Sequence, residues 1–99
     1  MANVRPDRSG LPFVVWISQK GGARHDLRVN VSAGPKAGAW RASVSVRPEI
    51  EIKEGELSSE EFALVYAWIE LNRDVLIGFW DGDIAYTEDA LAALRPLEA

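Results

Sequence analysis

The chain of 99 residues contains no cysteine and only one histidine, and both shortages limit the chemistry available to it. Without cysteine it cannot form a disulfide, a thiolate nucleophile or a cysteine-based zinc site, and we expect a cytoplasmic protein. It also lacks a Gly-x-Ser-x-Gly elbow, a glycine-rich phosphate loop and a histidine pair at metal-binding spacing. The sequence therefore gives little support for an enzyme, and we expect no metal and no cofactor.

Long hydrophobic runs are missing as well. The longest, FVVWI at 13–17 and VLIGFW at 75–80, fall far short of the roughly 20 residues with which a helix crosses a bilayer. The N-terminal stretch MANVRPDRSG has no apolar core of the kind found in secretion signals. We therefore expect a soluble protein without a membrane partner.

Charge is unevenly distributed along a chain whose net charge is −4. Residues 1–48 carry eight basic and two acidic side chains, whereas residues 49–99 carry three basic and thirteen acidic ones. One interpretation is that the two halves attract each other within one fold. The other is that a basic surface binds an anionic partner. We favour the first interpretation.

The first half of the chain has the pattern of β-strands. Residues 13–18 are apolar and rich in β-branched and aromatic side chains, and residues 27–32, 40–47 and 49–53 alternate between apolar and polar. Alternation predicts two faces. The apolar face takes Leu27, Val29, Val31, Trp40, Ala42, Val44, Val46, Ile50 and Ile52, and the polar face takes Arg28, Asn30, Ser32, Arg41, Ser43, Ser45 and Arg47.

The second half has the pattern of helices. Ser58 and Glu61 form the sequence of a capping box, and Gly82 suits the C-terminal end, so we expect a helix from Ser58 to about Trp80. One apolar row suits packing on the sheet, namely Phe62, Val65, Tyr66, Ile69, Leu76 and Phe79. A second row would be covered either by a short helix at 88–97 capped by Thr87 or by another subunit. Its members are Leu64, Trp68, Leu71 and Val75.

These elements predict an α+β fold. A small, mostly antiparallel sheet of three to four strands would be covered on one face by the long amphipathic helix, with a short C-terminal helix beside it. The length suits a single domain over residues 1–99, and we expect residues 1–11 to be a flexible N-terminal segment.

The single histidine, His25, follows a Gly-Gly turn and precedes Asp26. A histidine beside a carboxylate could act as a general base. Neighbouring residues of an extended chain point to opposite faces, however, so Asp26 would not orient the His25 ring unless the turn bent the two together. We therefore interpret His25 as a turn residue whose ring satisfies a backbone group, and it is only a weak catalytic candidate.

The polar sheet face supplies one candidate binding surface. Arg28, Asn30, Arg41 and Arg47 would lie on it together and could hold phosphates, with Trp16 as a stacking platform if it faced outward. This surface would suit a protein that binds nucleic acid or cleaves RNA. An ordinary solvated sheet face explains the same pattern.

Three segments resemble a known family: GGARHDLRVNVS, VSVRP and GELSSEEFALVYAWIELNRDVLIGFWDGDI. They look like the small bacterial proteins of unknown function that are encoded in toxin–antitoxin-like gene pairs, and the likeness runs from Phe13 to Leu97. It implies a compact α+β fold and a partner protein made from the adjacent gene. Commoner members carry a Pro-His-x-His-Val motif on the second strand, where this chain has Arg28 and Asn30 in place of the histidines. A paired-histidine role is therefore not carried over.

The leading interpretation is a non-enzymatic protein-interaction module, one half of such a pair. Its contact surface would be the wide apolar and acidic face of the long helix, with Trp68, Glu70 and Asp74 as partner-binding residues. The same surface could also join copies of this chain in a homo-oligomer. The alternative is nucleic-acid binding on the polar sheet face.

Overall fold

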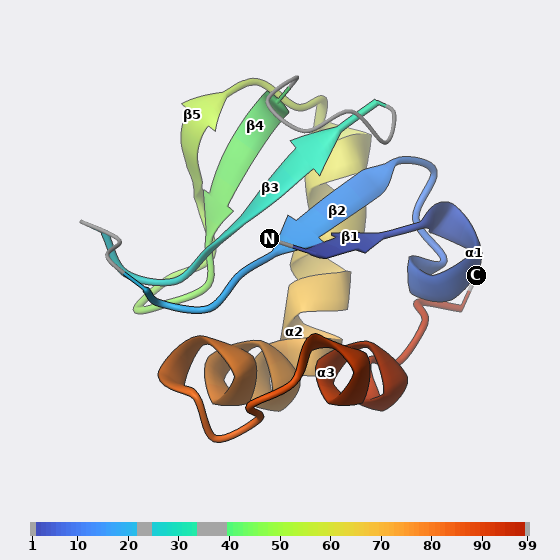
Figure 1. Ribbon diagram of the computed structural model, residues 1–99. Helices are drawn as coiled ribbons and strands as arrows, with labels where there is room; N and C mark the ends of the chain where they lie inside the picture. The colour runs from blue at the N-terminus through green and yellow to red at the C-terminus, as the bar shows by residue number, and fades with distance from the viewer. Residues whose placement is uncertain (1, 22–24, 34–39, 99) are drawn as a thin grey trace.

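The computed structural model describes residues 2–21, 25–33 and 40–98, which form an antiparallel sheet with a long helix against one face of it (Figure 1). The sheet has five strands in the order β1-β2-β3-β4-β5, and every neighbouring pair is antiparallel. In chain order the elements are β1 (Ala2–Val4), α1 (Pro6–Ser9), β2 (Val14–Ile17), β3 (Arg28–Ser32), β4 (Trp40–Ser45), β5 (Ile52–Gly55), α2 (Ser59–Asp81) and α3 (Thr87–Ala93).

The α+β class is confirmed, but the sheet has one strand more than the three to four expected. The extra strand is β1, which pairs with β2 over Ala2–Val4 inside the segment that we expected to be flexible. Val4 and Leu11 are buried, and the short helix α1 lies between them. Alternation could not reveal β1, because three residues are too few to establish a period of two.

Helix α2 crosses one face of the sheet, which we call the core face (Figure 1). The prediction of its ends is confirmed. The Ser58 hydroxyl accepts a hydrogen bond from the Glu61 amide at 3.1 Å, the Glu61 carboxylate accepts one from the Ser58 amide at 2.9 Å, and Gly82 takes a left-handed conformation with φ of 88°. Within the described part of the chain, no helix is long and apolar enough to cross a membrane.

The core lies between α2 and the sheet. Its fully or almost fully buried members include Val15, Val29, Val31, Val44 and Val46 from the strands, and Val65, Trp68, Ile69, Leu76 and Phe79 from α2. Each such side chain contributes roughly 1.5–3 kcal/mol relative to leaving it exposed to water. Burial of this valine-lined face is therefore what keeps α2 on the sheet.

The apolar rows of α2 agree with the prediction in part. Trp68 and Val75 of the second row are buried, as expected if the short final helix covers that row. Leu91 and Leu94 of the C-terminal segment pack against the core there. The exceptions are Tyr66 of the sheet-facing row, which is 40% exposed, and Leu64 and Leu71, which also remain exposed.

The short final helix also departs from its predicted ends. Tyr86 occupies the N-cap position of α3, so Thr87 is the first residue of the helix rather than its cap. The helix ends at Ala93, well before Leu97. Pro96 prevents the helix from reaching Leu97, because a proline disfavours the helical conformation of the residue before it.

A buried asparagine fastens the segment after α3 to α2. Asn72 is fully buried, and its amide nitrogen donates to the Trp68 carbonyl at 3.1 Å and to the Arg95 carbonyl at 2.9 Å. Its amide oxygen accepts from the Arg95 backbone N–H at 2.7 Å. Farther along, the Leu97 N–H donates to the Ser9 carbonyl at 2.7 Å, so this segment also reaches α1.

We predict that Asn72→Ala destabilises the protein by about 2–4 kcal/mol, because it leaves both the N–H and the carbonyl of Arg95 without their buried partner. Asn3→Ala is the matched control, since Asn3 is exposed, and it should change stability by less than about 0.5 kcal/mol. Urea unfolding followed by tryptophan fluorescence measures both. Equal effects of the two substitutions would show that Asn72 does not fasten the C-terminal segment.

Candidate binding site on the outer face of the sheet

The face of the sheet opposite α2, here the outer face, carries a polar row that crosses all five strands. The strand register places Asn3 beside Trp16, Trp16 beside Asn30, Asn30 beside Ser43 and Ser43 beside Glu54. Residues directly opposite each other on antiparallel strands have Cβ atoms about 4.5–5.5 Å apart. The row is therefore a continuous strip of polar and aromatic side chains.

A bulge in β4 determines which faces of the sheet Trp40 and Arg41 lie on. Val31 pairs with Ala42 and Ser32 pairs with Trp40, so Arg41 is an extra residue without an opposite partner on β3. Such a bulge shifts the alternation of side chains by one. Trp40 therefore lies on the outer face with Ser32, whereas regular alternation placed it on the core face. That part of the sequence prediction is wrong for Trp40.

Arg41 moves the other way for the same reason. Its guanidinium forms two hydrogen bonds with the Glu61 carboxylate of α2, at 2.7 and 3.0 Å. The backbone closes around the bulge, because the Glu56 N–H donates to the Arg41 carbonyl at 3.1 Å. Gly55, with φ of 77°, makes this approach possible, since a Cβ there would lie 2.0 Å from the Arg41 carbonyl oxygen.

A second bulge brings Glu54 to the outer face. On β5, Ile52 pairs with Val44 and Glu54 pairs with Ser43, which leaves Lys53 as the extra residue. Without it Glu54 would share the core side with Ile52. Two bulges on neighbouring strands thus place Trp40 and Glu54 on the same face, where strict alternation allows neither.

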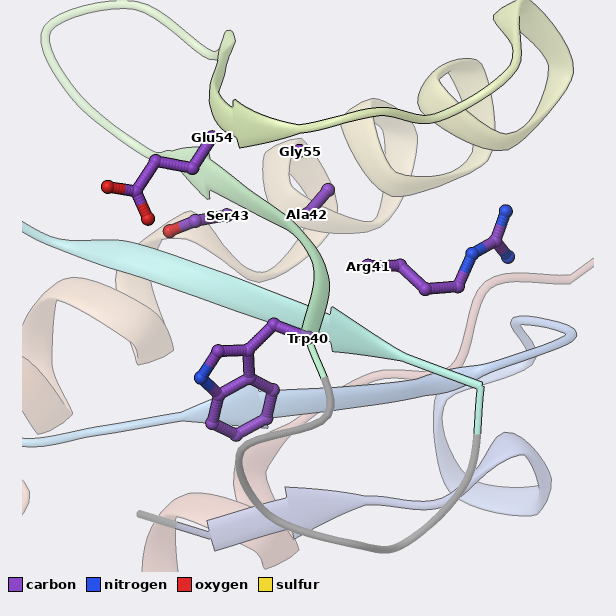
Figure 2. A pocket seen from close by; sticks show the side chains of 6 residues that line it. All are labelled: Trp40, Arg41, Ala42, Ser43, Glu54 and Gly55. Atoms are coloured by element: carbon purple, nitrogen blue, oxygen red, sulfur yellow. The ribbon is translucent and has the colours of Figure 1, made fainter.

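A hollow of about 240 Å³ lies on β4 and β5 and is lined by Trp40, Arg41, Ala42, Ser43, Glu54 and Gly55 (Figure 2). Figure 2 shows the Trp40 ring, the Ser43 hydroxyl and the Glu54 carboxylate on one side of the strands, with the Arg41 side chain pointing away from them. In the part of the chain that the structure describes, the Glu54 side chain has no ion pair or hydrogen bond. An unpaired carboxylate thus lies in the same hollow as an indole ring.

Trp40 rests on a second indole. Its ring centroid lies 5.3 Å from that of Trp16, and the two planes meet at 73°, an edge-to-face arrangement. Trp16 is buried and donates its indole N–H to the Ser32 hydroxyl at 2.8 Å. Trp40 itself is 37% exposed, so it presents part of its ring to solvent from a supported position.

The four residues predicted to bind nucleic acid do not gather on one surface. Arg28 and Asn30 lie on the outer face, and neither makes a side-chain hydrogen bond or ion pair within the described ranges. Arg41 is turned to Glu61 by the bulge. The Arg47 guanidinium contacts Asp26 at 3.0 Å and Asp81, at the end of α2, at 3.4 Å. The expected cluster of three arginines is therefore absent from the described part of the outer face.

The same ion pairs bear on the uneven charge. Arg41–Glu61 and Arg47–Asp81 each join the basic first half to the acidic second half, as the favoured interpretation expects. Asp26 is held ionised by its surroundings, because the Leu27 amide and then the Arg47 guanidinium lower the pKa of its carboxyl.

His25 has neighbours, but not those of a catalytic dyad. Its Nδ1 lies 2.8 Å from the carbonyl oxygen of Asp26, and its ring stacks on Trp80 with centroids 6.3 Å apart. The Asp26 carboxylate instead accepts hydrogen bonds from the Leu27 amide and Arg47. The contact with the Asp26 carbonyl agrees with the interpretation of His25 as a residue whose ring satisfies a backbone group. Among the described residues, no three histidine, aspartate or glutamate side chains are grouped to hold a metal ion.

The residues predicted to bind a partner on the helix are separated by the structure. Trp68 is fully buried, and its indole N–H has no hydrogen-bond partner, so this side chain cannot contact a partner from the surface of the fold. Asp74 is paired with Arg95 at 3.0 Å. Only Glu70 lies exposed and outside such a pair in the described part of the chain.

Sequence reasoning missed the roles of Trp40 and Glu54, and one signal could have found them. Gly55 lies two residues beyond the alternating segment 49–53, and a glycine in a strand often marks a bulge or a close backbone approach. Together with the opposite charges of Arg41 and Glu61, it could have indicated that the alternation breaks at this edge of the sheet.

We predict that Gly55→Ala destabilises the protein more than Gly82→Ala. Both glycines have positive φ, of 77° and 88°, so both substitutions strain the backbone by about 1–2 kcal/mol. Only at Gly55 would the new Cβ also collide with backbone, whereas nothing lies within 4 Å at Gly82. Chemical unfolding of the two variants tests this difference, and equal losses would contradict the close approach at the Arg41 bulge.

A second prediction concerns acid. The Arg41 guanidinium and then the Ser58 amide lower the pKa of Glu61 to about 2, and Arg95 lowers that of Asp74 to about 2. A carboxyl whose pKa is lower in the folded state stabilises the fold above its unfolded pKa. This contribution is therefore complete above about pH 4.5 and is lost as the pH falls towards about 2.

The free energy of unfolding should therefore decline across this window, and Arg41→Gln should make the decline shallower. The matched control is Arg73→Gln, because Arg73 forms no ion pair among the described residues. Urea titrations at about pH 6, about pH 4 and about pH 2.5 measure the slope. A slope that Arg41→Gln leaves unchanged would show that the pair with Glu61 does not contribute.

No family model, no curated protein and no solved structure matches the chain.

Proposed function

We propose that this chain is a non-enzymatic module that binds a partner protein through the outer face of its sheet. The observation that carries the proposal is the exposed Trp40 ring on a sheet face where three polar side chains, Arg28, Asn30 and Glu54, have no partner within the described residues. Tryptophan and arginine are enriched among the residues that dominate binding energy at protein interfaces. The outer face combines both with free hydrogen-bonding groups.

The burial of Trp68 moves the proposed surface from the helix to the sheet. A helix surface without Trp68 keeps the exposed Leu64 and Leu71, which are two turns of α2 apart. Single exposed apolar side chains are normal on soluble proteins and need no partner to explain them. The outer face offers instead a supported aromatic ring next to a hollow.

Charge favours a protein over a nucleic acid as the partner. Two of the four residues expected to hold phosphates, Arg41 and Arg47, are paired with carboxylates, and the Glu54 carboxylate in the hollow would repel a phosphate. The 73° angle between Trp16 and Trp40 also gives no flat platform on which successive bases could stack.

The non-enzymatic part of the proposal rests on the surroundings of His25. Its ring contacts a backbone carbonyl and Trp80, and the nearby Asp26 carboxylate is occupied by Leu27 and Arg47. In the cell, the partner made from an adjacent gene that the sequence resemblance suggests is the first candidate. The proposal thus retains one half of a toxin–antitoxin-like pair as the biological setting.

The proposal is tested by selecting peptides from a displayed random library on the wild-type protein. Trp40→Ala should weaken the binding of the selected peptides by about tenfold or more, as expected for an aromatic residue at the centre of an interface. Leu71→Ala is the matched control, since Leu71 is 39% exposed on α2, and it should leave affinity unchanged. Circular dichroism confirms that both variants are folded.

Other outcomes would overturn the proposal in identifiable ways. Peptides that lose affinity with Leu71→Ala but not with Trp40→Ala would return the binding surface to the helix. Asn30→Lys is a second outer-face variant that leaves the Trp16–Trp40 contact in place, and it should also weaken the binding of the selected peptides. Tight, salt-sensitive binding of single-stranded RNA that Arg28→Ala abolishes, without peptide binding, would favour the nucleic-acid alternative.

A further inference from the structure

The hollow beside Trp40 has the size of one side chain. Its volume of about 240 Å³ lies below the roughly 300–1,000 Å³ typical of sites that bind small molecules and cofactors. It is lined by residues of β4 and β5, and the side chains of Trp40, Ser43 and Glu54 lie on the outer face, where a partner would approach under the proposed function (Figure 2). A single side chain of that partner is therefore the occupant that fits.

The lining of the hollow selects the chemistry of this side chain. Trp40 supplies an indole ring, whose face attracts cations more strongly than the other aromatic side chains do. Glu54 supplies a carboxylate, and Ser43 lies between the two with a hydroxyl that can accept a hydrogen bond (Figure 2). A group with a flat cationic surface and N–H donors at its edge satisfies all three.

No cation of the described chain fills this role already. Arg41 lines the hollow but points away from it and is paired with Glu61. Lys53, the neighbour of Glu54, is paired with Glu51. Among the described residues Glu54 therefore has no counter-charge, on a surface that we propose to be an interface. The net charge of −4 also favours a basic partner.

We infer that the hollow lined by Trp40, Ser43 and Glu54 binds an arginine side chain of the partner protein. The guanidinium would lie against the exposed indole ring and donate hydrogen bonds from its edge to the Glu54 carboxylate and the Ser43 hydroxyl. A lysine would offer the charge without the flat surface, so arginine is the better match. This inference rests on the proposed function and specifies what the outer face recognises.

The test uses two small probes on the full chain. N-acetyl-arginine methylamide carries the guanidinium, and N-acetyl-citrulline methylamide has nearly the same shape without the charge. The indole N–H signals of the four tryptophans report binding by NMR, and the Trp40→Phe spectrum assigns the signal that matters. We expect the arginine probe to shift the Trp40 signal at millimolar concentration, with the citrulline probe at least about fivefold weaker.

Glu54→Gln should remove most of the preference for arginine, because it deletes the charge while keeping the shape. The matched control is Glu56→Gln, which removes the same charge two residues along the chain from a side chain outside the hollow. The control should retain the preference. The affinity of the selected peptides should likewise fall with Glu54→Gln and not with Glu56→Gln, which would show that their basic residue contacts Glu54.

Each contrary result overturns the inference by itself. Equal shifts with both probes, no shift with either, or equal effects of Glu54→Gln and Glu56→Gln would each exclude a specific arginine site. If selected peptides depend on Trp40 yet contain no required arginine, the proposed function stands and only this inference fails. If the arginine probe binds at Trp40 but no peptide does, the site is real and the wider interface is not.

Discussion

The packing of helix α2 on the core face determines what the rest of the sheet can do. The core-face valines of β2, β3 and β4 are buried beneath Val65, Trp68 and Ile69, so they cannot contact a partner. The final helix and the segment after it pack beside α2 and do not cover the other side of the sheet. On the strands, only the side chains of the outer face are therefore available to bind a partner. The proposed site depends on this division between a buried and an open face.

Two interruptions of the strand pattern then select which side chains reach that face. Each bulge adds one residue and reverses the orientation of the residues beyond it, so Trp40 and Glu54 leave the core side together. Arg41 is turned towards α2 by the same change, where Glu61 neutralises it. The bulges thus remove Arg41 from the outer face and bring an indole and a carboxylate to it, which is why we propose a cationic rather than an anionic partner group there.

The sequence was sufficient for the elements whose signals are local and was insufficient where distant backbone segments meet. Ser58, Glu61 and Gly82 determine the ends of α2 through their own hydrogen bonds and conformation, so those ends could be predicted. The orientation of Trp40 depends on the approach of Gly55 to the Arg41 carbonyl, a contact between residues far apart in the chain. The burial of Trp68 depends in the same way on what packs around α2, and the pattern of one helix cannot supply it. The sequence placed Arg28 and Asn30 correctly because β3 alternates without interruption through both.

The bond between Leu97 and Ser9 differs in kind from the pairing of the strands. Each strand pairs with the one that precedes or follows it in the chain, so the sheet assembles through contacts between close neighbours in sequence. The Leu97–Ser9 bond closes a loop that spans nearly the whole described chain, and the entropy of loop closure rises with the logarithm of its length. The C-terminal segment should therefore join the fold after the sheet has formed and should be among the first parts to open in the native state. Such an opening would expose the C-terminal half of α2 to solvent and leave the outer face, with Trp40 and Glu54, in place.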